Sequence, residues 1–174
     1  MLETLVTSKT RVKLLLKFFL NPATKAYLRS LEAEFGDSTN AIRLELNRFE
    51  KANMLTAEIS GNKKIFQVNQ QHPLFEDINK IIRKYVGIDV LLESIVNQLG
   101  KLDAVYLSGN LAQGMDDKII DLVFLGNINK IYLLELIPKA EKVIKRKIRF
   151  LVYTPEEFSQ FEKNGTDYLL IWNK

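Results

Sequence analysis

The hydrophobic period of the sequence changes near residue 54, and this change limits the folds that the chain can adopt. Before it, apolar residues recur at the three- and four-residue spacing of amphipathic helices. After it, two short runs have the composition of β-strands, and Ser60-Gly61-Asn62 lies between them as a tight turn in which Gly61-Asn62 suits positive φ. The elements expected here are helices at 9–20, 27–35 and 39–52 and strands at 54–59 and 63–68.

Residues that cap or end helices lie at the borders of these segments. Ser8 can cap the first helix, and Asn21-Pro22 ends it. Ser38 or Thr39 can cap the third helix. Three helices followed by a hairpin is the order of a winged helix-turn-helix, which we predict for residues 1–72.

The rest of the chain alternates between helical and extended patterns. Two amphipathic helices, 73–85 and 89–99, form an expected helical connector over residues 73–100 that is not rich in Gly, Ser or Pro. Beyond them we expect strands at 104–108, 118–125, 147–153 and 168–172, helices at 130–145 and 155–163, and a loop or short helix at 109–117. The predicted fold class is therefore α+β, with a C-terminal α/β domain and mixed sheet over residues 101–174.

Composition excludes several classes of protein. The chain has no cysteine, which rules out a disulfide framework, a thiolate zinc site and a cysteine nucleophile. The longest apolar stretch, residues 14–20, is interrupted by Lys17 and is too short to span a bilayer. No signal-peptide cleavage pattern follows the N-terminus. We therefore expect a cytoplasmic protein without membrane contact.

Positive charge is concentrated in the first half of the chain. Residues 1–87 hold 14 Lys and Arg against 9 Asp and Glu, whereas residues 88–174 hold 11 against 12. A basic half suggests a polyanionic partner, although an excess of this size also arises as ordinary scatter.

The third helix and the hairpin carry the residue types that a DNA-binding surface needs. Asparagine pairs with adenine and arginine with guanine in the major groove, while lysines of a wing contact the phosphate backbone. The candidate DNA-binding residues are Ser38, Thr39, Asn40, Arg43, Asn47, Asn62, Lys63 and Lys64. Taken singly, each residue favours a helix cap or a solvated face; their order favours binding of double-stranded DNA.

Several segments of the first half resemble a known family. They are Ser8–Arg11, Leu20–Pro22, Tyr27–Arg29, Leu46–Leu55, Gly61–Asn69 and His72–Phe75. Together they resemble the winged helix of ArsR/MarR-like transcriptional regulators fused to a nucleotidyltransferase-like domain of MNT type, over most of residues 8–86. The resemblance implies a homodimer that uses helices within 73–99 and binds a palindromic operator.

The second half is similar to the nucleotidyltransferase signature at residues 107–114 and 119–126. That signature has Gly-Ser after one strand and two aspartates one residue apart on the next. Residues i and i+2 of a strand face the same side, so two carboxylates there can hold Mg²⁺ on a nucleoside triphosphate.

This chain departs from that signature at its reactive positions. Asn110 replaces the serine, Ile119 replaces the first aspartate, and the strand at 147–153 carries Arg149 and no acid. Asp116 and Asp117 lie nearby, but their spacing from Asp121 is wrong for one strand face. We therefore predict no catalytic residue, no metal and no cofactor. The retained candidates for a vestigial ligand cleft are Gly109, Asn110, Gln113 and Asp121, which could instead serve only to shape the loop.

The sequence thus favours a DNA-binding transcriptional regulator with a catalytically inactive second domain that senses a small molecule or nucleotide, or supports assembly. The alternatives are an active metal-dependent nucleotidyltransferase with an autoregulatory DNA-binding domain, and a winged helix that binds protein. The basic run Lys142, Lys145, Arg146 and Lys147 could bind phosphate or mark a solvated helix end.

Overall fold

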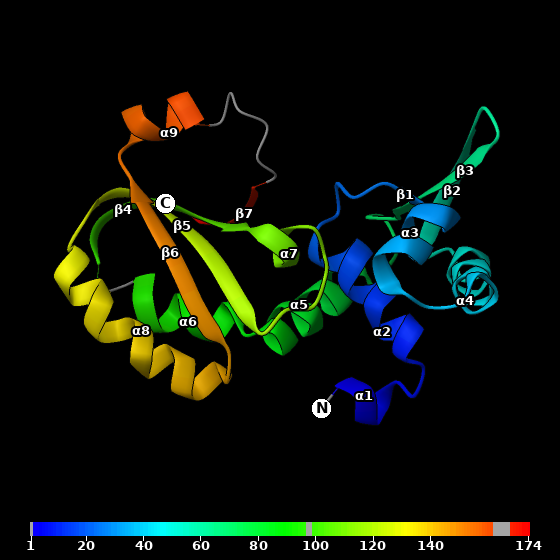
Figure 1. Ribbon diagram of the computed structural model, residues 1–174, viewed down its shortest axis with the longest axis horizontal. Helices are drawn as coiled ribbons and strands as arrows, with labels where there is room; N and C mark the ends of the chain where they lie inside the picture. Colours follow the sequence, from blue (N-terminus) through cyan, green and yellow to red (C-terminus); the bar gives the residue numbers. More distant parts are fainter. Residues whose placement is uncertain (1, 97–98, 162–167) are drawn as a thin grey trace. The chain divides into compact units, whose positions relative to one another are not determined.

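The computed structural model of the chain describes residues 2–96, 99–161 and 168–174 (Figure 1). The chain divides into two compact units, Met1–Tyr85 (unit 1) and Val86–Lys174 (unit 2). The division falls within the segment 73–100 that was expected to connect two domains.

Unit 1 contains several helices and a small sheet, and its last element is a helix that follows the sheet. Its helical elements are α1 (Leu2–Leu5), α2 (Lys9–Leu15), the π-helical continuation η1 (Leu16–Leu20), α3 (Leu28–Phe35), α4 (Thr39–Lys51) and α5 (Phe75–Val86). Its strands are β1 (Ala26–Tyr27), β2 (Leu55–Ser60) and β3 (Lys63–Val68). The predicted first helix is therefore present as α2 and η1 together.

The strands of unit 1 form an antiparallel sheet of order β1-β3-β2, in which β1 precedes α3 and the hairpin β2-β3 follows α4. In the hairpin Ser60 faces Lys63, and Gly61 turns the chain with a φ of 60°. Strand β1 was not predicted, because Tyr27 was expected to start a helix. Tyr27 is instead extended and pairs with Ile65 of β3, so α3 starts at Leu28.

The core of unit 1 joins its helices to the sheet. Among its largest fully buried side chains are Phe18 and Phe19 of η1 and Ile42 and Leu46 of α4. Helix α5 belongs to this unit because the Phe75 ring stacks on Phe19 at 6.0 Å and Asn79 Nδ2 donates to the Phe19 carbonyl at 2.6 Å.

Unit 2 is an α/β unit around one mixed sheet. Its elements are α6 (Ile88–Ile95), β4 (Gly100–Ser108), α7 (Gly109–Ala112), β5 (Ile119–Ile128), α8 (Lys130–Ile144), β6 (Lys147–Tyr153), α9 (Pro155–Phe161) and β7 (Leu169–Asn173). The strand order is β6-β5-β4-β7, in which β5 and β6 are parallel and the other pairs antiparallel. The prediction of a mixed α+β fold is thereby confirmed.

The helices of unit 2 cover the sheet at two places. Helices α6 and α8 lie side by side along one face of the sheet (Figure 1). At α9 the Phe158 ring stacks on Tyr106 of β4 at 4.9 Å. Strand β7 is the edge strand beside β4, and its Trp172 pairs with Val105.

Several boundaries in unit 2 differ from the predictions, among them the end of β5, which was expected at 125 and lies at Ile128. Strand β4 begins at Gly100, four residues before the predicted start, and the described part of the preceding helix ends at Ile95. The extension depends on Gly126 of β5, because a Cβ there would lie 2.4 Å from the Lys101 carbonyl. The end of the predicted helix 155–163 and residues 97–98 lie outside the described residues. Within the described ranges, no helix is long and apolar enough to cross a membrane.

Candidate functional site

A groove of about 420 Å³ lies in unit 1 between α3, α4 and the hairpin. It is lined by Tyr27, Leu28, Arg29, Arg43, Leu46, Asn62, Lys63, Lys64 and Phe66. Four of the eight predicted DNA-binding residues, Arg43, Asn62, Lys63 and Lys64, are therefore brought together. Tyr27 and Arg29 were not predicted as site residues; they enter the groove because β1 pairs with β3 and directs the start of α3 toward the hairpin.

The groove carries positive charge that the described residues leave largely unneutralised. Within residues 2–96, 99–161 and 168–174, no acidic side chain forms an ion pair with Arg29, Arg43 or Lys63. Lys63 Nζ lies 4.4 Å from the centre of the Tyr27 ring, a cation–π contact that holds the ammonium over the groove. Lys64 Nζ is 2.6 Å from Glu50 Oε2.

The predicted residues at the start of α4 divide into two groups. Ser38 Oγ accepts a hydrogen bond from the Ala41 amide at 3.2 Å, and Thr39 Oγ1 donates to Glu32 Oε1 at 2.5 Å. These two side chains thus cap α4 and tie it to α3. Asn40 and Asn47 are exposed and, seven residues apart, lie on the same face of the helix.

Helix α4 is fixed to α2 through a buried carboxylate. Glu45 accepts hydrogen bonds from Arg11 Nε at 2.9 Å and Nη2 at 3.2 Å, and from Arg48 Nη1 at 2.9 Å. Burial raises the pKa of Glu45. The hydrogen bonds from Arg11 and the charges of Arg11 and Arg48 lower it by more, so the pKa of Glu45 lies below its ordinary value. The Arg11 guanidinium is therefore engaged by Glu45.

The predicted cleft of unit 2 centres on Asp121 of β5. Arg149 of β6 stands beside it in the parallel register and donates from Nε at 2.6 Å and Nη2 at 2.8 Å to the two carboxylate oxygens. Gly109 has a φ of 65°, and a Cβ there would lie 2.7 Å from Asp121 Oδ2. The glycine therefore allows the α7 turn to approach the carboxylate closely.

The other two predicted cleft residues lie apart from Asp121. A hollow of about 350 Å³ beside it is lined by Ser108, Asp121, Leu122, Arg149, Phe150 and Leu151, which does not include Asn110 or Gln113. Asn110 Nδ2 instead donates to Asp117 Oδ2 at 2.6 Å. The Ile119 amide and Asn110 together lower the pKa of Asp117. Gln113 is exposed at the end of α7.

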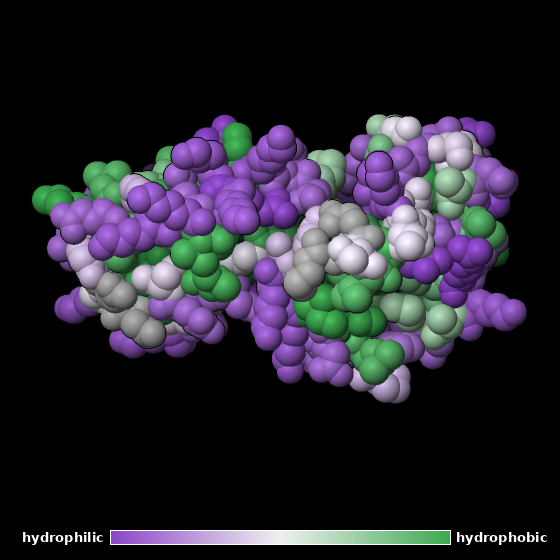
Figure 2. Space-filling model, turned by 90° about the horizontal axis from the view of Figure 1, so that it is seen from below, coloured by the Kyte–Doolittle hydropathy of each residue, from purple (hydrophilic) through white to green (hydrophobic). Residues whose placement is uncertain are grey.

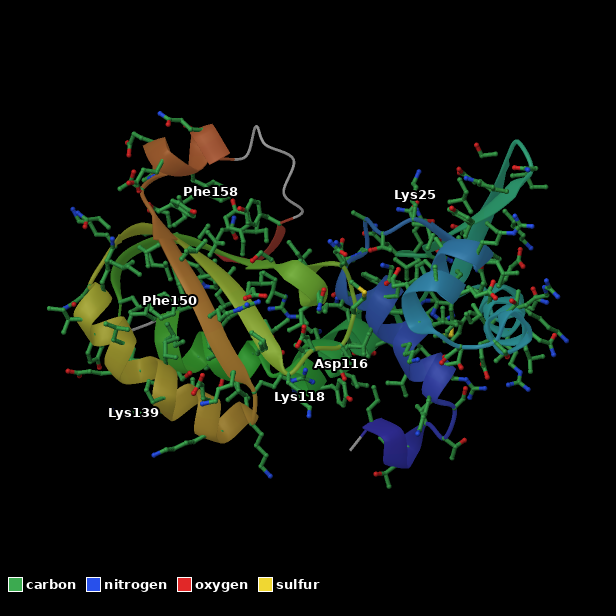
Figure 3. All side chains as sticks on the ribbon, in the orientation of Figure 1. Lys25, Asp116, Lys118, Lys139, Phe150 and Phe158 are labelled. Carbon is green, nitrogen blue, oxygen red and sulfur yellow. The ribbon has the colours of Figure 1, made fainter. Side chains whose placement is uncertain are left out.

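The acidic residues of this region do not gather around a common point. Among the described residues, no group of three His, Asp or Glu side chains could hold a metal ion. Asp116 and Lys118 lie on the loop that leads into β5 (Figure 3), where Asp116 accepts from Arg146 Nη1 at 2.7 Å. Lys147 pairs with Glu141 at 2.9 Å. Two cations of the basic run at 142–147 are thus paired with acids.

The comparisons with known proteins gave distant structural likenesses only. No protein-family model and no curated protein matches the chain. A mutant of the toxin-antitoxin MntA-HpeT is 19% identical, with 52% of this chain and 73% of that chain covered and a TM-score of 0.40. A candidate nucleotidyltransferase from Sulfolobus solfataricus is 22% identical. The match covers 56% of this chain and 86% of that chain, with a TM-score of 0.37.

A third solved structure, described as a possible transcriptional regulator for arsenical resistance, is 18% identical. The match covers 54% of this chain and 90% of that chain, with a TM-score of 0.32. At such scores the three likenesses do not assign the chain to a family.

Proposed function

We propose that unit 1 is a winged helix-turn-helix that binds double-stranded DNA, and that the protein is a transcriptional regulator. The observation that carries the proposal is the cationic groove between α4 and the hairpin, where Arg29, Arg43 and Lys63 converge without acidic partners among the described residues. A groove lined by cations focuses the electrostatic field and attracts a polyanion such as the DNA backbone.

In this proposal α4 enters the major groove and the hairpin contacts the neighbouring backbone. Asn40, Arg43 and Asn47 are exposed along α4 and have the donors and acceptors that base edges require. Lys63 and Lys64, beside the turn at Asn62, contact phosphates. Ser38 and Thr39 contribute by holding the start of α4 in place.

We propose further that unit 2 does not catalyse nucleotidyl transfer and acts in ligand sensing or assembly. In a catalytic site of that kind, a pair of carboxylates must be free to bind the metal. Here Ile119 takes the place of one carboxylate, and the Arg149 guanidinium occupies both oxygens of Asp121. A small anionic ligand could reach Arg149, which is largely exposed beside the hollow.

A mobility-shift titration tests DNA binding. Duplexes enriched from a randomised library by the wild-type protein serve as probe. The Arg43→Ala/Lys63→Ala variant should lose about 2 kcal/mol of binding free energy, roughly 30-fold in affinity, because one base contact and one phosphate contact are removed. The matched control is Lys139→Ala/Lys142→Ala, which removes two exposed cations of α8. Enrichment of no duplex at low salt, or equal losses in both variants, would refute the proposal.

A further inference from the structure

The outward face of α4 contains one apolar side chain, for which the proposed polar contacts to bases and phosphates give no role. The buried residues of α4 are Ile42, Glu45, Leu46 and Phe49, which define its inner face. Leu44 points away from them, because each residue rotates the side-chain direction by about 100°. Leu44 keeps 51% of its surface exposed.

The neighbours of Leu44 on this face are polar. Asn40 precedes it by one turn, Asn47 follows by three residues, and both are exposed. Arg43, Arg48 and Lys51 are also exposed on α4. Among the described residues of α4, Leu44 is the one large hydrophobic side chain at the surface. It therefore forms an isolated apolar point between two amides, in contrast to the broad apolar patch typical of a protein-docking helix.

We infer that Leu44 contacts the C5-methyl group of a thymine in the major groove, and that the DNA site contains A·T pairs at the centre of the α4 contact. This inference rests on the proposed DNA binding. Asparagine amides pair with adenine N6 and N7, and the thymine methyl is the apolar group that the major groove displays at an A·T pair. Two asparagines flanking a leucine match that combination of groups.

The test replaces thymine by deoxyuridine, which removes the methyl group and retains the base-pairing edge. The strongest duplex from the randomised library is synthesised in both forms, and its affinity is measured for the wild type, Leu44→Ala and Leu134→Ala. Leu134 is a matched control, since it is 61% exposed on α8 of unit 2. Alanine is a better helix former than leucine, so both variants retain their helices.

For the wild type, deoxyuridine should weaken binding about fourfold, the effect of losing one buried methyl contact. The Leu44→Ala variant should bind both duplexes equally, whereas Leu134→Ala should keep the wild-type difference. Equal affinity of the wild type for the two duplexes would overturn the inference and leave DNA binding intact. The same holds if Leu44→Ala keeps the fourfold difference. Failure of every duplex to bind at low salt would overturn DNA binding and the inference together.

Discussion

Glu45 shows how a single buried side chain positions the candidate DNA-binding helix. Its carboxylate receives three hydrogen bonds from Arg11 and Arg48, and its side chain is 6% exposed. Removing the charge leaves Arg11 and Arg48 without their common anionic partner. The orientation of α4 against α2 therefore depends on an ionised carboxylate inside unit 1.

We predict that Glu45→Gln lowers the free energy of unfolding by about 2 kcal/mol at neutral pH, the contribution typical of hydrogen bonds to a charged group. The folded-state pKa of Glu45 is lowered from the ordinary value of 4.5. Its stabilising contribution is thus complete above about 4.5 and is lost as the pH falls through the folded-state pKa.

Urea unfolding at pH 7 and near pH 3 measures this effect. The difference in free energy of unfolding between the wild type and Glu45→Gln should be smaller at the lower pH. The control Glu58→Gln, which changes an exposed side chain, should have the stability of the wild type at both pH values. A difference that stays constant with pH would show that the charge of Glu45 does not stabilise the fold.

At the scale of elements, the parallel pairing of β5 with β6 determines the chemistry of unit 2. The register places Arg149 opposite Asp121, and Ile119 two residues earlier on the same face of β5. A cationic side chain therefore pairs with both oxygens of this carboxylate. Replacing Ile119 by aspartate and Arg149 by alanine should provide a pair of free carboxylates on this face.

We predict that Ile119→Asp/Arg149→Ala binds Mn²⁺ roughly tenfold more tightly than the wild type, because two carboxylates on one strand face then share the ion. Electron paramagnetic resonance of free Mn²⁺ gives the affinity, and circular dichroism verifies the fold. Arg149→Ala alone is the control and should gain little. Binding by the wild type as tight as by the double variant would contradict the proposed loss of the metal site.

Elements with local signals were predictable from the sequence, and elements that depend on distant pairing were not. Helix α8 was expected at 130–145 and spans Lys130–Ile144, with Asn129 accepting from the Tyr132 amide as its cap. Strand β1 was missed because its partner β3 lies about forty residues away. For the same reason the sequence did not reveal that Arg29 enters the groove or that Arg149 binds Asp121.

At the scale of the whole molecule, unit 1 has an apolar surface suited to pairing with a second copy. A groove of about 470 Å³ between α1, α2, α4 and α5 is lined mainly by apolar side chains. Leu5 is 77% exposed and Ile81 49%. Hydrophobic side chains gather over α1 on this face (Figure 2). We propose that this surface is the interface of the homodimer that the sequence resemblance implies, which was expected to form through helices within 73–99.

We predict that Ile81→Asp converts a dimer to a monomer, because a charge buried at an apolar interface is strongly unfavourable. Light scattering after size-exclusion chromatography gives the molar mass. Ile131→Asp on α8, where the isoleucine is 76% exposed, is the control and should leave the mass unchanged. A wild type of monomeric mass, or Ile81→Asp of dimeric mass, would refute this interface.

The position of Trp172 allows the unfolding of one unit to be followed separately. It is the single tryptophan of the chain and lies in β7, beside Val105 of the unit 2 sheet. Indole fluorescence therefore reports on unit 2 alone, whereas far-ultraviolet ellipticity includes the helices of both units. Denaturation curves recorded by the two signals will coincide if the units unfold as one cooperative body and will separate if each melts independently.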